Sequence, residues 1–274
     1  MTTPTTQTAA PTSDATTRTH PEPATTDDAP AARRLAVEVW SDIACPWCFI
    51  GKRRLTAALA AFPHRDLVDV RWRAYELSPD APHGPGVPEL DALARHKGLP
   101  ADQVRQMFAQ VTAVAAGDGL VYDFDRTLSI NTFDLHRLVH VAREIGGDAL
   151  AGRLVETFFS AHFEHGADLG DPGTIVELAR TAGLGACGLD DQGVRDVLAG
   201  DRGAAAVRDD EAQARAIGVN GVPFVVVDRR IAVSGAQPVG VFTELLEAAW
   251  AQANPTLQLL GDDDAACVDD SCAL

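Results

Sequence analysis

The motif Cys45-Pro46-Trp47-Cys48 constrains this 274-residue chain more than any other feature. It stands between an alternating segment typical of a β-strand, residues 35–41, and a segment with helical spacing that begins at Pro46. Proline suits the first position of a helix, where no backbone N–H is needed. The pattern therefore predicts two thiols, about one helical turn apart, at the N-terminus of a helix that follows a strand.

The position of the two cysteines predicts redox chemistry. Unpaired N–H groups at a helix N-terminus stabilise an anion, so we expect Cys45 to be partly thiolate and to be the exposed nucleophile. Cys48 is expected to be less accessible and to release a mixed disulfide by attacking the sulfur of Cys45. Such a pair requires no organic cofactor and no metal, because the sulfur atoms carry the electrons.

Composition narrows the class of protein. The formal net charge of −16, from 23 basic and 39 acidic residues, argues against binding to nucleic acid. No stretch has the roughly 18 to 20 apolar residues of a membrane helix, and residues 1–34 lack the apolar core and charged start of a secretory signal. We therefore expect a cytoplasmic protein without nucleic-acid or membrane partners, in which a cysteine pair is redox-active or metal-binding.

The chain divides by pattern into a β-rich framework and a helical block. Strand patterns cover residues 35–41, 67–74, 223–228 and 231–234. Helical patterns cover residues 46–62, 88–97, 101–116, 132–145, 148–164, 172–182, 190–199, 203–217 and 238–253. This order predicts an α/β sheet domain interrupted by a helical insertion. Residues 1–34 are predicted to be a disordered tail, and residues 255–274 an acidic C-terminal tail.

Three segments together resemble a known family. They are Ser41-Asp-Ile-Ala-Cys-Pro-Trp-Cys-Phe-Ile-Gly-Lys-Arg-Arg54, Gly218-Val-Asn-Gly-Val-Pro-Phe224 and Ala232-Val-Ser-Gly-Ala-Gln-Pro238. With them, roughly residues 36–252 are similar to the FrnE-like branch of the DsbA-type thiol-disulfide oxidoreductases. The resemblance implies a thioredoxin-like fold with a large all-helical insertion domain. Residues 35–80 and 218–254 would form the discontinuous thioredoxin-like domain, and residues 81–217 the insertion.

The resemblance also implies an activity and its partners. It implies that the chain exchanges disulfides, as an oxidoreductase or isomerase, with proteins that carry thiols or disulfides, and it leaves glutathione open as a small thiol partner. The Val222-Pro223 bond is implied to be cis, with Pro223 facing the cysteines across a substrate groove. The Val222 backbone could pair with an extended substrate segment, and Pro46 and Trp47 lie between the two thiols.

Two further features of the resemblance concern the surroundings of the cysteines. Asn131 and His136 lie in a segment similar to one that borders the cleft in this family, so they are candidate groove residues. Trp47 stands where DsbA proper has a histidine. A neutral indole supplies no positive charge, so we expect a less oxidising disulfide and favour reduction or isomerisation of substrate disulfides.

The other cysteines receive weaker assignments. Cys267 and Cys272 form a C-x4-C pair in the acidic tail, which we interpret as an accessory electron relay or a substrate-like regulator that exchanges with the first pair. Incidental thiols or a metal half-site stay open as alternatives for this pair. Cys187 has no cysteine neighbour in the sequence and is interpreted as a small hydrophobe without a role.

Other classes of function stay open at this point. Four cysteines could form a structural zinc site, and the helical block could act as a chaperone-like binder. The insertion also resembles kappa-class glutathione transferases and 2-hydroxychromene-2-carboxylate isomerases, which usually carry serine where Cys45 stands. A cluster of metal-ligand types is interpreted as a solvated helix end, since no fourth ligand with convincing spacing follows: His162, Glu164, His165 and Asp168.

Overall fold

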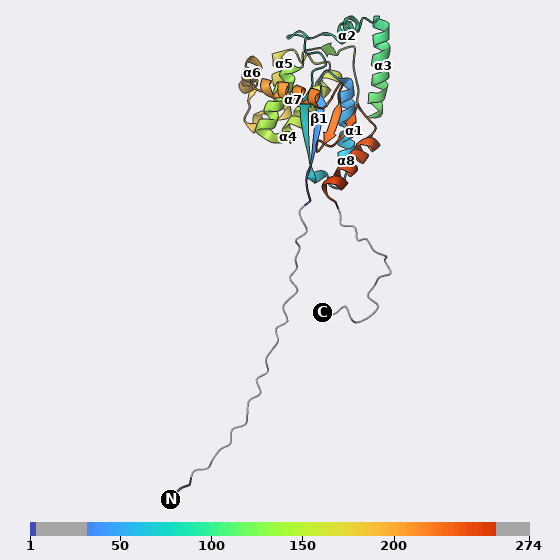
Figure 1. The fold of residues 1–274 in the computed structure, drawn as a ribbon. Helices are drawn as coiled ribbons and strands as arrows, with labels where there is room; N and C mark the ends of the chain where they lie inside the picture. The colour runs from blue at the N-terminus through green and yellow to red at the C-terminus, as the bar shows by residue number, and fades with distance from the viewer. Residues whose placement is uncertain (4–31, 256–274) are drawn as a thin grey trace, which may run out of the picture. The chain divides into compact units, whose positions relative to one another are not determined.

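Strands from both ends of the folded sequence form one mixed sheet. The structure, a computed structural model, describes residues 1–3 and 32–255. The strands are β1 (Leu35–Ser41), β2 (Val68–Ala74), β5 (Phe224–Val227) and β6 (Ile231–Ser234), in the order β2-β1-β5-β6. β1 and β2 are parallel, and the other neighbours are antiparallel. The predicted sheet, supplied by two distant parts of the chain, is confirmed (Figure 1).

Strands β5 and β6 form a hairpin. The N–H of Arg230 donates to the carbonyl of Val227 at 3.0 Å, and Asp228 and Arg229 between them have φ values of 50° and 57°. Two positive φ values in succession define a type I′ turn, whose twist matches that of the strands it joins.

The helices follow the predicted segments closely. They are α1 (Pro46–Ala61), α2 (Glu89–Lys97), α3 (Ala101–Gly117), α4 (Phe133–Phe163), α5 (Pro172–Ala182), α6 (Asp191–Ala199), α7 (Ala204–Ala216) and α8 (Val239–Ala253). Four short elements were not predicted: η1 (Arg65–Leu67), η2 (Gly185–Cys187) and the paired strands β3 (Val87–Pro88) and β4 (Leu128–Ser129). Segments of two or three residues are too short to show a period.

Helix α4 contains a break where the sequence predicts the end of one helix and the start of another. Gly147 has φ of 72° and ψ of −175°, which is not a helical conformation. This region of φ and ψ is nearly restricted to glycine, so the residue type permits the break. The two predicted helices, 132–145 and 148–164, correspond to the two halves of α4.

Different helices cover the two faces of the sheet. Leu35, Val37 and Val39 of β1 belong to the main hydrophobic core, on the side where α1 and α8 pack. Trp40 points the other way and packs with Ala214 of α7. This division follows from the alternation of side chains along a strand.

One hydrophobic core joins the sheet to the helices that follow it. It includes Val37 and Val39 of β1 together with Leu135, Leu154 and Phe158 of α4. Because the core is shared, and because α7 packs directly on β2, the proposed domain boundaries at residues 80 and 218 stay predictions.

Some predictions from the sequence concern residues that lie outside the part of the chain that the structure describes. The two predicted tails lie almost wholly outside residues 1–3 and 32–255, and so do Cys267 and Cys272. Among the helices that are described, none is long and apolar enough to cross a membrane.

Candidate active site

The cysteine pair stands at the start of α1, as predicted. Cys45 is the N-cap residue, with extended backbone angles, and Pro46 opens the helix. The N–H of Cys45 donates to the carbonyl of Asp42 at 3.1 Å, and the N–H of Cys48 donates to the carbonyl of Cys45 at 3.0 Å. Both cysteines are free thiols. The strand, the turn and the first helical turn therefore hold the two thiols beside each other.

The expectation of an exposed nucleophile is wrong for this structure. Cys45 is only 4 % exposed and Cys48 only 1 %. The sulfur of Cys45 lies 3.6 Å from the backbone carbonyl oxygen of Val222, so the segment that precedes β5 covers it. Sequence spacing could not show this contact, because the two residues are 177 positions apart.

The Val222-Pro223 peptide bond is cis, and Pro223 packs against α1. A Cβ at Gly51 would lie 2.8 Å from Cγ of Pro223, closer than side chains tolerate. Glycine at position 51 therefore allows the loop before β5 to lie directly on the helix that carries the cysteines. The role of Pro223 in positioning a substrate stays a prediction.

Burial distinguishes the chemistry of Cys48. Its removal from water, and then the neighbouring Cys45 thiol, raise the pKa of Cys48 well above the usual range of a cysteine. The Ser41 hydroxyl lies beside this thiol and favours the thiolate, although it makes no well-aligned hydrogen bond. Cys48 is therefore a protonated thiol and must lose its proton before it can attack a disulfide.

The residues between the cysteines differ in their surroundings. Trp47 is 42 % exposed and offers its indole to solvent next to the buried thiols. The carbonyl of Pro46 accepts a hydrogen bond from the hydroxyl of Tyr122 at 2.6 Å. Burial raises the pKa of Tyr122, so this phenol stays a donor. Tyr122 was missed by the sequence analysis, and no local pattern marks it.

Asn131 and His136 are both buried. The side-chain amide of Asn131 donates to the carbonyl of Ala81 at 2.9 Å, and its oxygen accepts from the N–H of Phe133 at 3.0 Å, at the start of α4. Nε2 of His136 lies 3.4 Å from Oδ1 of Asp42. Their role as groove residues stays a prediction, but in this structure both serve internal contacts.

Asp42 is a second residue that the sequence analysis did not single out. It is fully buried directly behind the cysteine turn and accepts a hydrogen bond from the N–H of Leu77 at 2.7 Å. Burial opposes its ionisation, but the His136 ring and the Leu77 N–H outweigh burial and hold the pKa of Asp42 below its usual value. A charged residue directly after a buried strand was the available signal.

The histidines near the end of α4 only partly match the solvated helix end that was predicted. His165 is exposed, but His162 is buried, and Nδ1 of His162 has no hydrogen-bond partner. The helix turns His162 towards the core, where it packs edge-on against Phe163. Burial lowers the pKa of His162 to about 4. Among residues 1–3 and 32–255, no group of three or more ligand types is placed to hold a metal ion.

The fold and the cysteine pair agree with the comparison of this sequence with known protein families and solved structures. Residues 36–247 match the DSBA-like thioredoxin domain, and the chain belongs to this family. A probable DsbA oxidoreductase from Streptomyces coelicolor has 42 % sequence identity, with 88 % of this chain and 99 % of that chain covered and a TM-score of 0.74. The thioredoxin-like fold with helical insertion is thereby confirmed. No curated protein sequence matches the chain.

More distant structures share the fold alone. A cytosolic disulfide reductase, DsbM from Pseudomonas aeruginosa, has 20 % identity over 80 % of this chain and 100 % of that chain, with a TM-score of 0.55. The same protein with GSH gives 22 % identity, coverage of 78 % and 98 %, and a TM-score of 0.53. A 2-hydroxychromene-2-carboxylate isomerase gives 14 % identity, coverage of 79 % and 97 %, and a TM-score of 0.54.

Proposed function

We propose that the chain is a thiol-disulfide oxidoreductase that acts through Cys45 and Cys48. The observation that carries this proposal is the pair of free, adjacent thiols at the start of α1, with the Val222 carbonyl 3.6 Å from the Cys45 sulfur. Membership in a family of DsbA-like proteins supports the same chemistry. No metal or organic cofactor takes part in the exchange.

The proposed reaction has two steps. The Cys45 thiolate attacks one sulfur of a substrate disulfide, a bond forms between the two sulfurs, and the other substrate sulfur leaves with the electron pair. The Cys48 thiolate then attacks Cys45, and the second substrate sulfur leaves. The substrate gains two electrons, and the protein keeps a Cys45–Cys48 disulfide. The raised pKa of Cys48 suits this order, because Cys48 then keeps its proton during the first attack.

Access to Cys45 requires that its cover opens. The cover is the Val222 carbonyl, and once its contact with the Cys45 sulfur opens, an extended substrate segment would pair with the Val222 backbone. Trp47 would offer an exposed apolar surface beside the thiol. Substrates of this kind are protein segments or small molecules that carry a disulfide.

We propose reduction or isomerisation as the direction of the reaction. Trp47 adds no positive charge beside Cys45, so nothing at this position favours the reduced protein in the way an imidazolium would. This direction fits a reducing compartment such as the cytoplasm. Equilibration of the pair with glutathione measures its potential, and a strongly oxidising value would contradict the proposal.

Glutathione is the proposed small thiol partner. One fold neighbour is described with GSH, which makes glutathione the first thiol to test here. A glutathione-dependent isomerase or transferase is the competing reading. Replacing Cys45 by serine separates the two, because disulfide reduction would disappear, whereas an isomerase or transferase activity could persist.

Trapping of mixed disulfides tests the proposed function directly. In a Cys48→Ser variant the second step cannot occur, so substrates should stay linked to Cys45 and be identified by mass spectrometry. The matched control is Cys187→Ser, which removes a thiol outside the pair and should trap nothing. Failure of the Cys48→Ser variant to hold any thiol partner would contradict Cys45 as the nucleophile.

The tail cysteines are a separate proposal. Cys267 and Cys272 are proposed to exchange with Cys45 and Cys48 as an accessory pair. A Cys267→Ser/Cys272→Ser double variant should reduce small disulfides normally and turn over more slowly with the physiological reductant. Equal rates with both would remove the tail from the cycle.

A further inference from the structure

One side chain from the segment between α3 and α4 contacts the residue that follows each cysteine of the pair. The hydroxyl of Tyr122 donates to the carbonyl of Pro46 at 2.6 Å. The Tyr122 ring stacks on that of Phe49, with 6.1 Å between the ring centroids and 19° between the planes. Phe163 of α4 packs against the same ring at 5.0 Å. Because Tyr122 is only 7 % exposed, these contacts fix the phenol beside the cysteine turn.

The carbonyl that accepts this hydrogen bond belongs to the same peptide unit as the N–H of Trp47. A donor on the oxygen of an amide draws electron density from its nitrogen, so the N–H becomes a stronger donor. Hydrogen bonds linked in this way strengthen one another by about 10 to 30 %. Within the described part of the chain, the Trp47 N–H donates to no backbone carbonyl, as is usual in the first turn of a helix. This N–H is therefore available to an anion at the start of α1.

The side chain of Cys45 is the group that this N–H can reach. Cys45 is the N-cap residue of α1, and the side chain of an N-cap residue accepts from the N–H of the second or third helical residue. The third residue, Cys48, already donates its N–H to the carbonyl of Cys45 at 3.0 Å. The second residue is Trp47. As a thiol, Cys45 makes no such cap, and its sulfur lies 3.6 Å from the Val222 carbonyl oxygen. A thiolate has no proton to donate to that oxygen, so it needs a donor instead.

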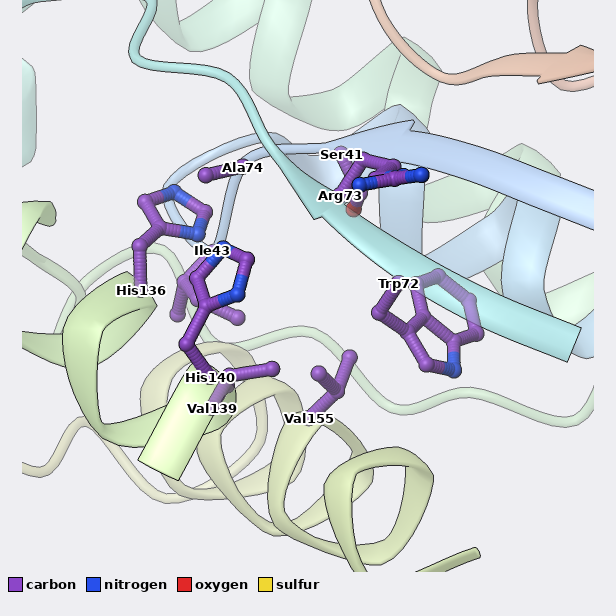
Figure 2. Close-up of a pocket in the computed structure, with 9 residues that line it drawn as sticks. All are labelled: Ser41, Ile43, Trp72, Arg73, Ala74, His136, Val139, His140 and Val155. Atoms are coloured by element: carbon purple, nitrogen blue, oxygen red, sulfur yellow. The ribbon is translucent and has the colours of Figure 1, made fainter. Parts of the chain in front are cut away.

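The basic side chains behind the cysteine turn already face carboxylates. Figure 2 shows His136 and His140 pointing from α4 towards the end of β2, where Arg73 lies. Nε2 of His136 lies 3.4 Å from Oδ1 of Asp42. Nε2 of His140 lies 2.8 Å from Oδ2 of Asp210, and Nη1 of Arg73 lies 2.7 Å from Oδ1 of the same residue. For the nucleophile, the start of α1 is thus the available source of positive charge.

We propose that Tyr122 is a positioning residue, which stabilises the thiolate of Cys45 through the peptide unit that follows Pro46. The inference rests on the proposed function, in which this thiolate attacks the substrate disulfide. When the thiol loses its proton to solvent, the Tyr122 hydroxyl stays on the Pro46 carbonyl, and the Trp47 N–H donates to the sulfur anion. Tyr122 keeps its own proton throughout and does not touch the substrate.

The pH dependence of Cys45 alkylation tests this role. Iodoacetamide reacts with thiolates, and tandem mass spectrometry distinguishes label at Cys45 from label at Cys48. A Tyr122→Phe variant keeps the stacked ring and loses the hydroxyl. We expect the midpoint of its pH profile to rise by about 0.3 to 0.6 pH units, which is a loss of about two- to fourfold in thiolate below the midpoint. At high pH, where the thiol is fully ionised, its rate should stay within about twofold of the wild-type rate.

The second tyrosine of the chain supplies the matched control. Tyr75 packs with Trp40 on the opposite face of the sheet, so Tyr75→Phe should keep the wild-type midpoint. In this background Tyr122 is the only tyrosine, and 3-fluorotyrosine supplied during expression replaces it alone. Burial keeps the phenol protonated. Because a fluorinated phenol is a stronger donor, it should lower the midpoint, opposite to the effect of phenylalanine.

Three results would overturn the inference. They are an unchanged midpoint in Tyr122→Phe, a fall of the rate by the same factor at every pH, which indicates packing or access, and a fluorotyrosine shift in the same direction as that of phenylalanine. None of them contradicts the proposed function, because Cys45 would still be alkylated and Cys48→Ser would still trap substrates. If Cys45 of the wild type is alkylated at no pH while Cys187 is, the proposed nucleophile is wrong, and the role of Tyr122 falls with it.

Discussion

The two halves of α4 place histidines in opposite environments. Before the break at Gly147, His136 and His140 face buried carboxylates, Asp42 and Asp210. After the break, His162 lies against the ring of Phe163, and its Nδ1 has no hydrogen-bond partner. The residue type is the same and all three side chains are buried. The residue on the neighbouring element therefore decides the role of a buried histidine. Opposite a carboxylate it makes a polar contact, and opposite an aromatic ring it is a neutral core residue.

The largest effect should come from the ion network of the first half. Asp210 accepts from Arg73 at 2.7 Å and from the N–H of Ala74 at 2.9 Å, and Arg73 is itself mostly buried. Arg73 also pairs with Glu38, so an Asp210→Asn variant removes one of its two carboxylate partners and should cost about 3 kcal/mol of unfolding free energy. Urea denaturation measures this cost. The exposed neighbour Asp209, changed to Asn, should alter stability by less than about 0.5 kcal/mol.

In the second half of α4, the buried His162 should make the stability of the protein depend on pH. The pKa of His162 is about 4 in the folded protein and about 6.5 when unfolded. Between these values the unfolded chain binds more protons, so stability is lost as pH falls from about 6.5 to about 4. The gap corresponds to about 3 kcal/mol.

A His162→Gln variant tests this assignment, because it has no group to titrate in that window. Its unfolding free energy should fall less than that of the wild type over the same pH range. His165→Gln should keep the wild-type slope, since His165 is exposed. Identical slopes for wild type and His162→Gln would show that His162 is not the neutral histidine described here.

The junction between the halves depends on glycine. At Gly147 the φ of 72° and ψ of −175° disfavour any side chain, so Gly147→Ala should cost about 1 to 3 kcal/mol. Gly117→Ala at the end of α3 is the matched control, because open space surrounds that position. It should be neutral or slightly stabilising. If Gly147→Ala and Gly117→Ala changed thermal unfolding equally, the break would tolerate alanine, and the prediction would be wrong.

The smallest effect should come from the ion pairs that join the second half to α1. Glu156 accepts from Lys52 at 2.5 Å and from Arg53 at 2.7 Å, and all three side chains keep some exposure. A Glu156→Gln variant should lose about 0.2 to 1 kcal/mol at low salt. At about 1 M salt, where the screening length is short, the difference should nearly vanish. A loss that persists in salt would point to packing instead of charge.

Much of the fold could be predicted because its elements are long and periodic. The strands at 35–41 and 231–234 and the helices from α1 to α8 agree with the sequence to within a few residues. The sequence could not predict which helix packs on each face of the sheet. Alternation shows that β1 has two faces, but the position of α7 against Trp40 is set by contacts between segments about 170 positions apart.

The candidate site shows the same division between local and distant information. A strand, a turn and the start of a helix position Cys45, Pro46 and Cys48, and the local sequence predicts these elements. The burial of Cys45 depends on Val222, and the contact of Asp42 depends on His136, both far along the chain. Ser41 could have been noticed as a polar residue facing the core side of β1.

The contact between the Val222 carbonyl and the Cys45 sulfur also has a consequence for synthesis of the protein. The ribosome makes Cys45 177 residues before it makes its cover. At roughly 5 to 20 residues per second, about 10 to 35 seconds pass between the two. A nascent chain of this protein therefore carries both thiols with no cover, and chaperones or oxidants that meet it then encounter a reactive dithiol that the finished fold conceals.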